Sequence, residues 1–171
     1  ERKIDITNIY SLDRTTDDTS DEGGLSAAYG FDYSILNKLN TKELFNFKLA
    51  NNFRLEQNND LPNNNQIGEK TSNLFSEIMF NPSEAFTTKY ISSIKNNLQD
   101  INYENLITDL KLNNFVTTFD YLNENNSSNT KSYLTATTKL NLNESNSIQF
   151  STRENKSSNL TEYYNLMYEY K

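Results

Sequence analysis

Two runs of the sequence carry a large apolar side chain at every second residue. In the first run, about residues 25–36, and in the second, about 43–56, the apolar positions are Leu25, Ala27, Tyr29, Phe31, Tyr33 and Ile35, and then Phe45, Phe47, Leu49, Phe53 and Leu55. Successive side chains of a β-strand point to opposite faces, so each run has one apolar and one polar face. Each run has about 11 residues or more, whereas a globular strand usually has about 5–6 and a tilted strand crossing a bilayer needs about 9–11. Long two-faced strands between polar turns are typical of an outer-membrane β-barrel.

The composition favours a sheet with one face exposed to water over a soluble domain with a large core. Hydrophobic residues make up 35% of the chain, against roughly 45–50% in soluble domains. An aromatic content of 12%, with 11 Tyr and 10 Phe, argues against disorder, because disordered chains are poor in aromatic residues. A barrel wall needs apolar side chains only at alternate positions, since its interior is polar.

Charge and residue usage exclude several classes of function. The net charge is -7, and nothing resembles the clustered basic face that nucleic acid requires. The sequence has no Cys and no His, which excludes disulfides, thiolate chemistry, His-based triads and His/Cys metal sites within it. No stretch approaches the 18 or so apolar residues of a membrane helix. The N-terminus is no signal peptide and lacks an initiator Met, so we expect a fragment or a processed product.

Turn signals divide the rest of the chain into short apolar runs at hairpin spacing. We expect an all-β antiparallel meander of about nine or ten strands, with residues 1–171 forming a single, partial segment of a β-barrel domain. The expected features are a short strand at 4–12, long polar loops near 13–24 and 57–70, a turn at 37–42, a strand from Leu74 to Phe80, turns at 81–83, 99–100, 113–114, 123–130, 143–147 and 155–159, and a last strand near 160–170. Residues 83–112 also fit helical spacing, and a helix there remains the alternative.

Few residues suggest chemistry, and we assign no catalytic, cofactor-binding or metal site and expect no enzymatic activity. The acidic cluster formed by Asp13, Asp17, Asp18, Asp21 and Glu22 is a calcium candidate, but it lacks EF-hand spacing, so a solvated loop is the preferred interpretation. Arg14 in this loop is expected to pair with these carboxylates or with an anionic lipid headgroup, and only burial would make it important. The carboxylates on polar faces are expected to be solvated and to face the lumen: Asp32, Glu56, Glu77 and Asp120. We expect part of the tyrosine-rich end to form a membrane-interface girdle: Tyr163, Tyr164, Tyr168 and Tyr170.

Several short motifs occur in a characteristic order. The succession is Asn8-Ile9-Tyr10-Ser11-Leu12-Asp13-Arg14, Asp18, Asp21-Glu22-Gly23, Tyr29-Gly30, Leu61-Pro62, Lys70-Thr71-Ser72-Asn73, Asn81-Pro82 and Tyr164-Asn165-Leu166-Met167-Tyr168-Glu169-Tyr170. It resembles the barrel region of the LptD (OstA) family of outer-membrane lipopolysaccharide-assembly proteins, which carries N-x-F-S-x-N-R, D-x-x-E-G, Y-G and L-P…K-x-S-D…P stretches in this order. The chain departs from that pattern at Tyr10 in place of Phe, at Asp13 in place of Asn, and in having no Arg directly after Asp18.

The resemblance implies a middle-to-late part of the wall of a very large transmembrane barrel in the Gram-negative outer membrane. Such a barrel receives lipopolysaccharide from periplasmic bridge proteins, holds a lipoprotein plug, and releases its cargo through a lateral gate into the outer leaflet. The implied partners are therefore lipopolysaccharide, the plug lipoprotein, the periplasmic bridge proteins and membrane lipid. No mechanistic residue carries over from the family. Two alternatives remain open: a porin-like passive channel barrel, and a soluble β-sandwich or adhesin module.

Overall fold

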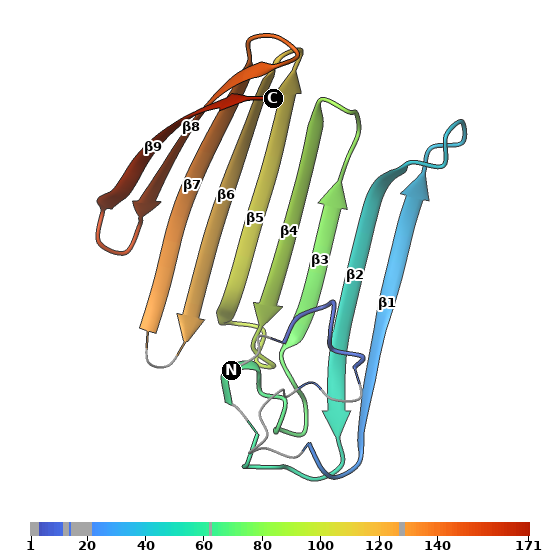
Figure 1. Ribbon diagram of the computed structural model, residues 1–171. Coiled ribbons are helices and arrows are strands. Elements are labelled where there is room, and N and C mark those ends of the chain that lie inside the picture. Colours follow the sequence, from blue (N-terminus) through green and yellow to red (C-terminus); the bar gives the residue numbers. More distant parts are fainter. Residues whose placement is uncertain (1–3, 12–13, 15–21, 62, 127–128) are drawn as a thin grey trace.

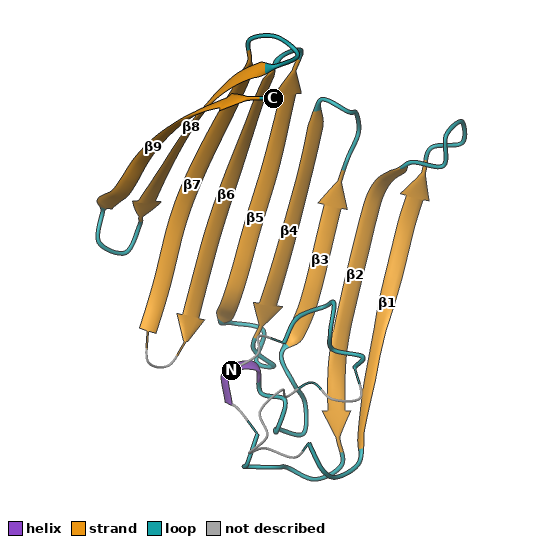
Figure 2. Ribbon diagram, viewed as in Figure 1, coloured by secondary structure: helices purple, strands orange, loops and turns teal. Residues whose placement is uncertain are grey.

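Alternating side chains build nine antiparallel strands that lie side by side in one sheet, in chain order (Figures 1 and 2). The computed structural model describes residues 4–11, 14, 22–61, 63–126 and 129–171, and structural statements refer to these. The strands are β1 (Ser26–Leu36), β2 (Glu43–Arg54), β3 (Leu74–Phe80), β4 (Phe86–Ile94), β5 (Ile101–Leu112), β6 (Phe115–Asn126), β7 (Asn129–Asn141), β8 (Asn146–Asn155) and β9 (Leu160–Tyr170). A 3₁₀ turn at Asn63–Asn65 is the one helical element in the described part of the chain.

The structure confirms the antiparallel meander and excludes a helix at 83–112, where β4 and β5 form instead. The sheet is open, with β1 and β9 at its edges. Every strand except β3 has at least nine residues, longer than the usual globular strand of about 5–6. Figure 1 shows the sheet bending round at its β8–β9 edge.

Two expected boundaries were wrong. Residues 4–11 form no strand, because Asp5 starts a turn: its carbonyl oxygen accepts hydrogen bonds from the backbone N–H groups of Asn8 and Ile9 at 3.2 and 3.0 Å. The polar run 123–130 is not one broad turn either. β6 continues to Asn126 and β7 begins at Asn129, since polar residues there pair across the hairpin in unbroken register.

The connections differ between the two ends of the sheet. One end, here called the loop end, carries the long β2–β3 connection at 55–73, and residues 4–11 lie there too (Figure 1). The other end, the turn end, carries only the turns at 37–42, 81–85, 113–114 and 142–145. In the tightest of these, Asn113 adopts a φ of 50°, which Asn tolerates better than most residues.

The buried apolar core is small and lies at the loop end. It combines residues 4–11 and the β2–β3 loop with two strand positions, and its members are Ile4, Ile6, Ile9, Ala50, Leu61, Ile67 and Phe75. Within the described residues, no layer covers either face over the rest of the sheet. The character of these two faces is therefore the main clue to function.

Candidate functional site

One face of the sheet carries a continuous apolar belt across all nine strands. The strand register places its members on the same face: Tyr29, Phe31, Tyr33, Ile35, Phe45, Phe47, Leu49, Ile78, Phe80, Phe86, Tyr90, Leu106, Leu110, Leu112, Phe115, Phe119, Tyr121, Leu134, Leu140, Ile148, Phe150, Tyr164, Leu166, Tyr168 and Tyr170. Most of these side chains are exposed, among them Phe31 at 56% and Leu166 at 72%. Soluble monomers rarely expose contiguous apolar patches beyond a few hundred Å², so this face is built for an apolar environment.

The belt ends in a hydrogen-bonded polar row on the same face. Ser76, Ser92, Glu104 and Asn123 pair in register across β3–β6, two residues from the belt toward the loop end. The two serine hydroxyls lie 2.7 Å apart. Glu104 accepts hydrogen bonds from the Tyr90 hydroxyl at 3.0 Å and the Asn123 amide at 3.1 Å. The row therefore interrupts the apolar face, with the Tyr90 hydroxyl bonded to it, while Leu74 and Ile94 lie beyond it on the same face.

The opposite face, here called the polar face, is held together by ion pairs and hydrogen bonds between neighbouring strands. At its centre Glu77 on β3 bridges Lys48 on β2 and Lys89 on β4, with N–O distances of 3.0 and 2.9 Å. The Glu77 side chain is only 7% exposed, whereas both lysine side chains are nearly 40% exposed. The carboxylate is therefore enclosed, and the two ammonium groups reach toward solvent.

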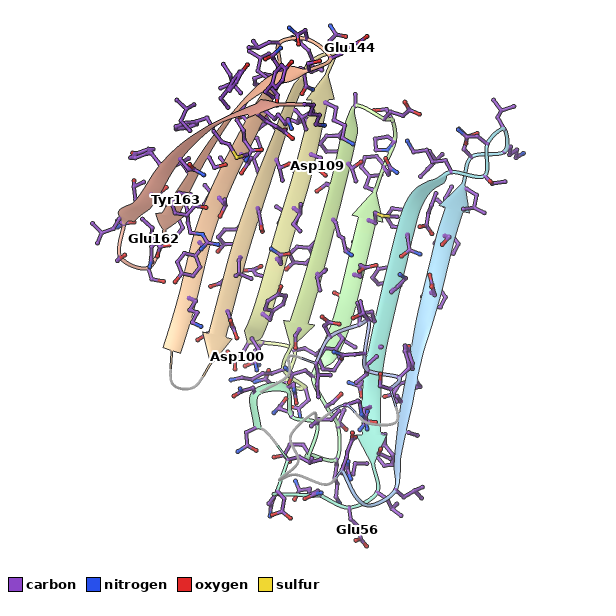
Figure 3. The ribbon with its side chains drawn as sticks, viewed as in Figure 1. Glu56, Asp100, Asp109, Glu144, Glu162 and Tyr163 are labelled. Atoms are coloured by element: carbon purple, nitrogen blue, oxygen red, sulfur yellow. The ribbon has the colours of Figure 1, made fainter. Side chains whose placement is uncertain are left out.

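Similar pairs continue along the polar face. Asn46 donates to Asp32 at 2.8 Å, and Asn105 donates to Asp120 at 2.6 Å. Lys139 pairs with Glu169 at 2.6 Å. Three of the four carboxylates expected on polar faces lie on this one: Asp32, Glu77 and Asp120. The expectation that they are solvated was wrong for Glu77, because its two lysine partners and the neighbouring strands enclose it. The fourth, Glu56, lies beyond the end of β2 in the loop that follows (Figure 3).

The polar face also carries an aromatic and cationic group at its β7–β9 side. The Arg153 guanidinium lies 5.1 Å from the centre of the Tyr133 ring and 5.9 Å from that of Tyr163. Its Nη1 is 4.0 Å from a Glu162 carboxylate oxygen, and Figure 3 shows Glu162 and Tyr163 next to the β8–β9 turn. The expected tyrosine girdle is thus divided, because Tyr163 belongs to the polar face while Tyr164, Tyr168 and Tyr170 belong to the belt.

A buried arginine cluster closes the loop end of the polar face. It consists of Arg14, Glu22, Asn52 and Arg54, and the two arginines are 5% and 1% exposed. Arg14 forms an ion pair with Glu22 and donates to Asn52 at 2.8 Å and to Ser26 at 3.1 Å. Arg54 lies 3.6 Å from the same Glu22 oxygen and donates to the carbonyl oxygens of Gly23 and Ile67 at 2.6 and 3.3 Å.

The cluster confirms that Arg14 pairs with a carboxylate of its own loop. Arg14 is also buried, which is the setting in which this pair becomes important. It also shows what the sequence did not reveal, namely that Asn52 and Arg54 complete the cluster. Arg54 ends β2 in the ordinary alternating pattern, and nothing local distinguishes it from a solvated strand end. The other members of the acidic calcium candidate, Asp13, Asp17, Asp18 and Asp21, lie outside the described residues. No group of acidic side chains able to hold a metal ion occurs among the residues that are described.

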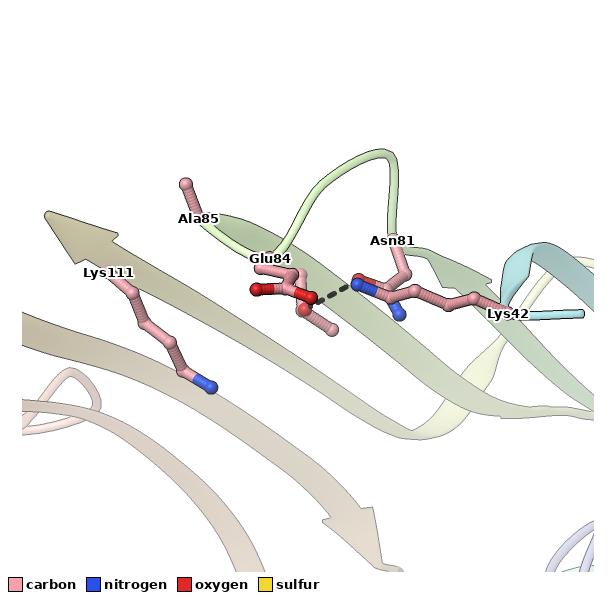
Figure 4. Close-up of a pocket in the computed structure, with 6 residues that line it drawn as sticks. Lys42, Asn81, Glu84, Ala85 and Lys111 are labelled. Atoms are coloured by element: carbon pink, nitrogen blue, oxygen red, sulfur yellow. Dashed lines mark hydrogen bonds between the residues drawn. The ribbon is translucent and has the colours of Figure 1, made fainter. Parts of the chain in front are cut away.

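An open hollow of about 550 Å³ lies at the turn end. Figure 4 shows Lys42, Asn81, Glu84 and Lys111 around it, with Thr87 hydrogen-bonded to Asn81 at 3.1 Å. Its wall is polar and mixed in charge. It adds a second hydrophilic region to the polar face and none to the belt.

Within the described residues no helix is long and apolar enough to cross a membrane. No protein-family model matches the sequence, and no curated protein is significantly similar to it.

Proposed function

We propose that this chain is part of the wall of an outer-membrane β-barrel that assembles lipopolysaccharide into the outer leaflet of the Gram-negative outer membrane. The observation that carries the proposal is the exposed apolar belt, which crosses every strand of the sheet. In water such a belt would cost about 25 cal/mol for each Å² of apolar surface left exposed. In a bilayer the same surface contacts acyl chains.

The slant of the belt supports a barrel wall. Successive cross-strand pairs connect Tyr33 on β1 with Leu134 on β7, so these two residues lie in one row perpendicular to the strands. On β1 the belt starts at Tyr29, four residues from this row toward the loop end. On β9 it starts at Tyr164, which is in register with Ala136, two residues from the row toward the turn end. A climb of this size across the sheet corresponds to a strand tilt of roughly 25–30°, approaching the roughly 35–45° of transmembrane barrels.

The two faces and two ends also follow the pattern of such barrels. Outward side chains are mostly apolar and inward ones mostly polar, although Phe75, Ile91 and Ile107 lie on the inward face, and aromatic residues lie at the borders of the apolar band. Barrels of this class have short periplasmic turns and longer extracellular loops. The longest connection, 55–73, lies at the loop end, beside short turns such as 95–100, and on this connection we assign the loop end to the cell exterior and the turn end to the periplasm.

The choice of lipopolysaccharide as cargo rests on the resemblance of the motif order to the LptD (OstA) family. A glycolipid with phosphorylated sugars needs a hydrophilic path past the hydrocarbon core. The polar face offers such a path, lined by paired charges such as Lys48, Glu77 and Lys89. The lipoprotein plug and the periplasmic bridge proteins are the further partners proposed on the same ground.

A porin-like passive channel is the second candidate, favoured by the same charges on the polar face. Charged side chains lining a pore also select ions. The two functions differ in what passes along this face, since a porin passes small solutes and conducts ions whereas an assembly barrel contacts lipopolysaccharide.

Site-specific photocrosslinking in cells separates these candidates. A photoreactive residue replaces Ile91, which lies on the polar face between Glu77 and Asn105, in the protein expressed in a Gram-negative host. We expect a lipopolysaccharide adduct that disappears when lipopolysaccharide synthesis is blocked. Ion conductance without an adduct would support the porin instead. Release of the protein from membranes by alkaline carbonate would contradict both, and would favour a soluble module.

A further inference from the structure

Residues 4–11, here called the strap, lie across the polar face at the loop end (Figure 1). Three isoleucines of the strap enter the buried core, and Ile9 is fully buried with Ile67 of the β2–β3 loop. The strap is not a strand of the sheet. It covers polar-face positions of β1–β3 that would otherwise be open like the rest of this face.

The sheet has a patch of small residues on which the strap packs. Ala28 and Gly30 on β1 and Ala50 on β2 are the small residues of the polar face at this level. The Tyr10 hydroxyl occupies the space that a Cβ at Gly30 would need. Ala50 is 1% exposed, because Ile9 and its neighbours pack over it. The small side chains of β1 and β2, together with the buried Phe75 on β3, make this region a fitted contact for the strap.

The arginine cluster fastens the strap at the point where it leaves the sheet. Arg14 donates to the carbonyl oxygen of Ile9 in the strap at 3.3 Å and to Asn52 on β2 at 2.8 Å. Arg54 joins the same carboxylate, Glu22, to the β2–β3 loop through Ile67. One carboxylate therefore holds together the strap, the strand and the loop.

The charge balance of this cluster is poor for a purely structural contact. Among the residues that the structure describes, two enclosed guanidinium groups share one carboxylate, and the polar atoms Arg14 Nε, Arg54 Nη2 and Asn52 Nδ2 have no hydrogen-bond partner. Buried charges are costly to desolvate unless they are fully paired. Both arginines pair with Glu22, so the closed state depends on the negative charge of Glu22.

We propose that the strap is a removable cover of the polar face and that the Arg14–Glu22–Arg54 cluster is its lock. When the Glu22 charge is lost or drawn away, two uncompensated guanidinium groups move to water and take the strap and the loop with them. The polar face of β1–β3 then opens at the loop end. What would pass beneath the open strap rests on the proposed function, whereas the cover and its lock do not.

Thiol labelling tests the cover directly, because the sequence contains no cysteine. Ala50→Cys places a reporter beneath the strap, and Gln149→Cys places one on the uncovered polar face of β8. A hydrophilic maleimide is applied to the folded protein. We expect the Ala50→Cys thiol to react at least about tenfold more slowly than the Gln149→Cys thiol in the parent chain. Equal rates would overturn the cover.

Glu22→Gln tests the lock, because it removes the charge and keeps the shape. It should speed labelling of the Ala50→Cys thiol at least about tenfold and leave the Gln149→Cys thiol unchanged. Glu162→Gln is the matched control: it removes the same charge from the exposed Arg153 pair and should change neither rate. Unchanged protection in folded Glu22→Gln would overturn the lock.

Ile6→Asn keeps the proposal falsifiable if Glu22→Gln does not fold. This change weakens the strap without touching the cluster, and it should also speed labelling of the Ala50→Cys thiol; continued protection would overturn the removable cover. Failure of the proposed function is visible separately. If the proposed function is wrong, alkaline carbonate extracts the protein from membranes although the Ala50→Cys thiol is still protected. If the strap proposal is wrong, the protein stays in the membrane and the Ala50→Cys thiol of the parent chain reacts quickly.

Discussion

Phe119 and Asp120 are neighbours on β6, yet they face opposite environments. The Phe119 side chain is 41% exposed within the apolar belt, while Asp120 accepts a 2.6 Å hydrogen bond from Asn105 on the polar face. This one-residue switch recurs along the strands and makes the sheet two-faced. It also gives neighbouring positions at which the same substitution should act very differently.

In the barrel wall that we propose, Phe119→Arg should therefore prevent stable insertion, while Thr118→Arg should be tolerated. An arginine facing lipid near the middle of a barrel wall costs about 2–4 kcal/mol. Thr118 lies on the polar face, where it donates to Asp109 at 2.6 Å, so an arginine there finds carboxylates and water. The measurement is the urea midpoint of unfolding in lipid vesicles. Equal midpoints for the two variants would place Phe119 in water.

The Glu77 bridge gives a prediction about the polar face. Glu77→Gln leaves Lys48 and Lys89 without their shared carboxylate, and hydrogen bonds to charged groups are worth about 1.5–3 kcal/mol. We expect a loss of stability within that range in the free energy of unfolding from urea titration. Lys48→Met with Lys89→Met in the same background should then cost little more, because their partner is already gone. A double-mutant cycle showing additive losses would contradict the bridge.

The strands were largely predictable because their pattern is local. The strands expected at 25–36 and 43–56 are observed at Ser26–Leu36 and Glu43–Arg54. Strict alternation of apolar and polar residues is compatible with few structures other than a β-strand. Ile4 and Ile6 alternate in the same way but form no strand, because they pack against Leu61 and Ile67. Those partners lie more than 50 residues away, and no local pattern identifies them.

For the candidate sites too, contacts within one loop were predictable from the sequence, whereas contacts between distant segments were not. Arg14 and Glu22 share one loop, so their pairing was predictable from the sequence. Burial of Arg54 was not, because it requires Gly23 and the β2–β3 loop to fold over the end of β2. The helical alternative for 83–112 arose because Leu106, Ile107 and Leu110 are all apolar. The register shows that Ile107 faces the polar side and the two leucines face the belt.

The two-residue turn between β5 and β6 should be sensitive to the backbone angle of its first residue. Asn113 has a φ of 50°, a left-handed conformation that costs other L-residues roughly 1–2 kcal/mol. Asn113→Val should lower the free energy of unfolding by about that amount, whereas Asn113→Gly should match or exceed the parent. The check is the denaturation midpoint of the three chains. A valine variant as stable as the glycine variant would show that the turn has a different backbone.

The β4–β5 turn predicts a shifted titration at Asp100. Its pKa is lowered below the ordinary value, first by the hydrogen bond from Asn97 and then by the one from Lys95, whose contacts with Asp100 measure 3.2 and 3.3 Å. Because the folded pKa is the lower one, the turn gains stability above the unfolded pKa, near 4, and loses it as the pH falls through the folded value.

Carboxyl NMR titration of Asp100 measures this pKa directly. Asn97→Ala and Lys95→Met should each raise it toward the ordinary value, because each removes a contact that lowers it. Only the Lys95 contribution is an ion pair between exposed groups, so raising the salt concentration should shrink the difference between Lys95→Met and the parent. An Asp100 pKa that responds to neither substitution would show that these contacts do not form.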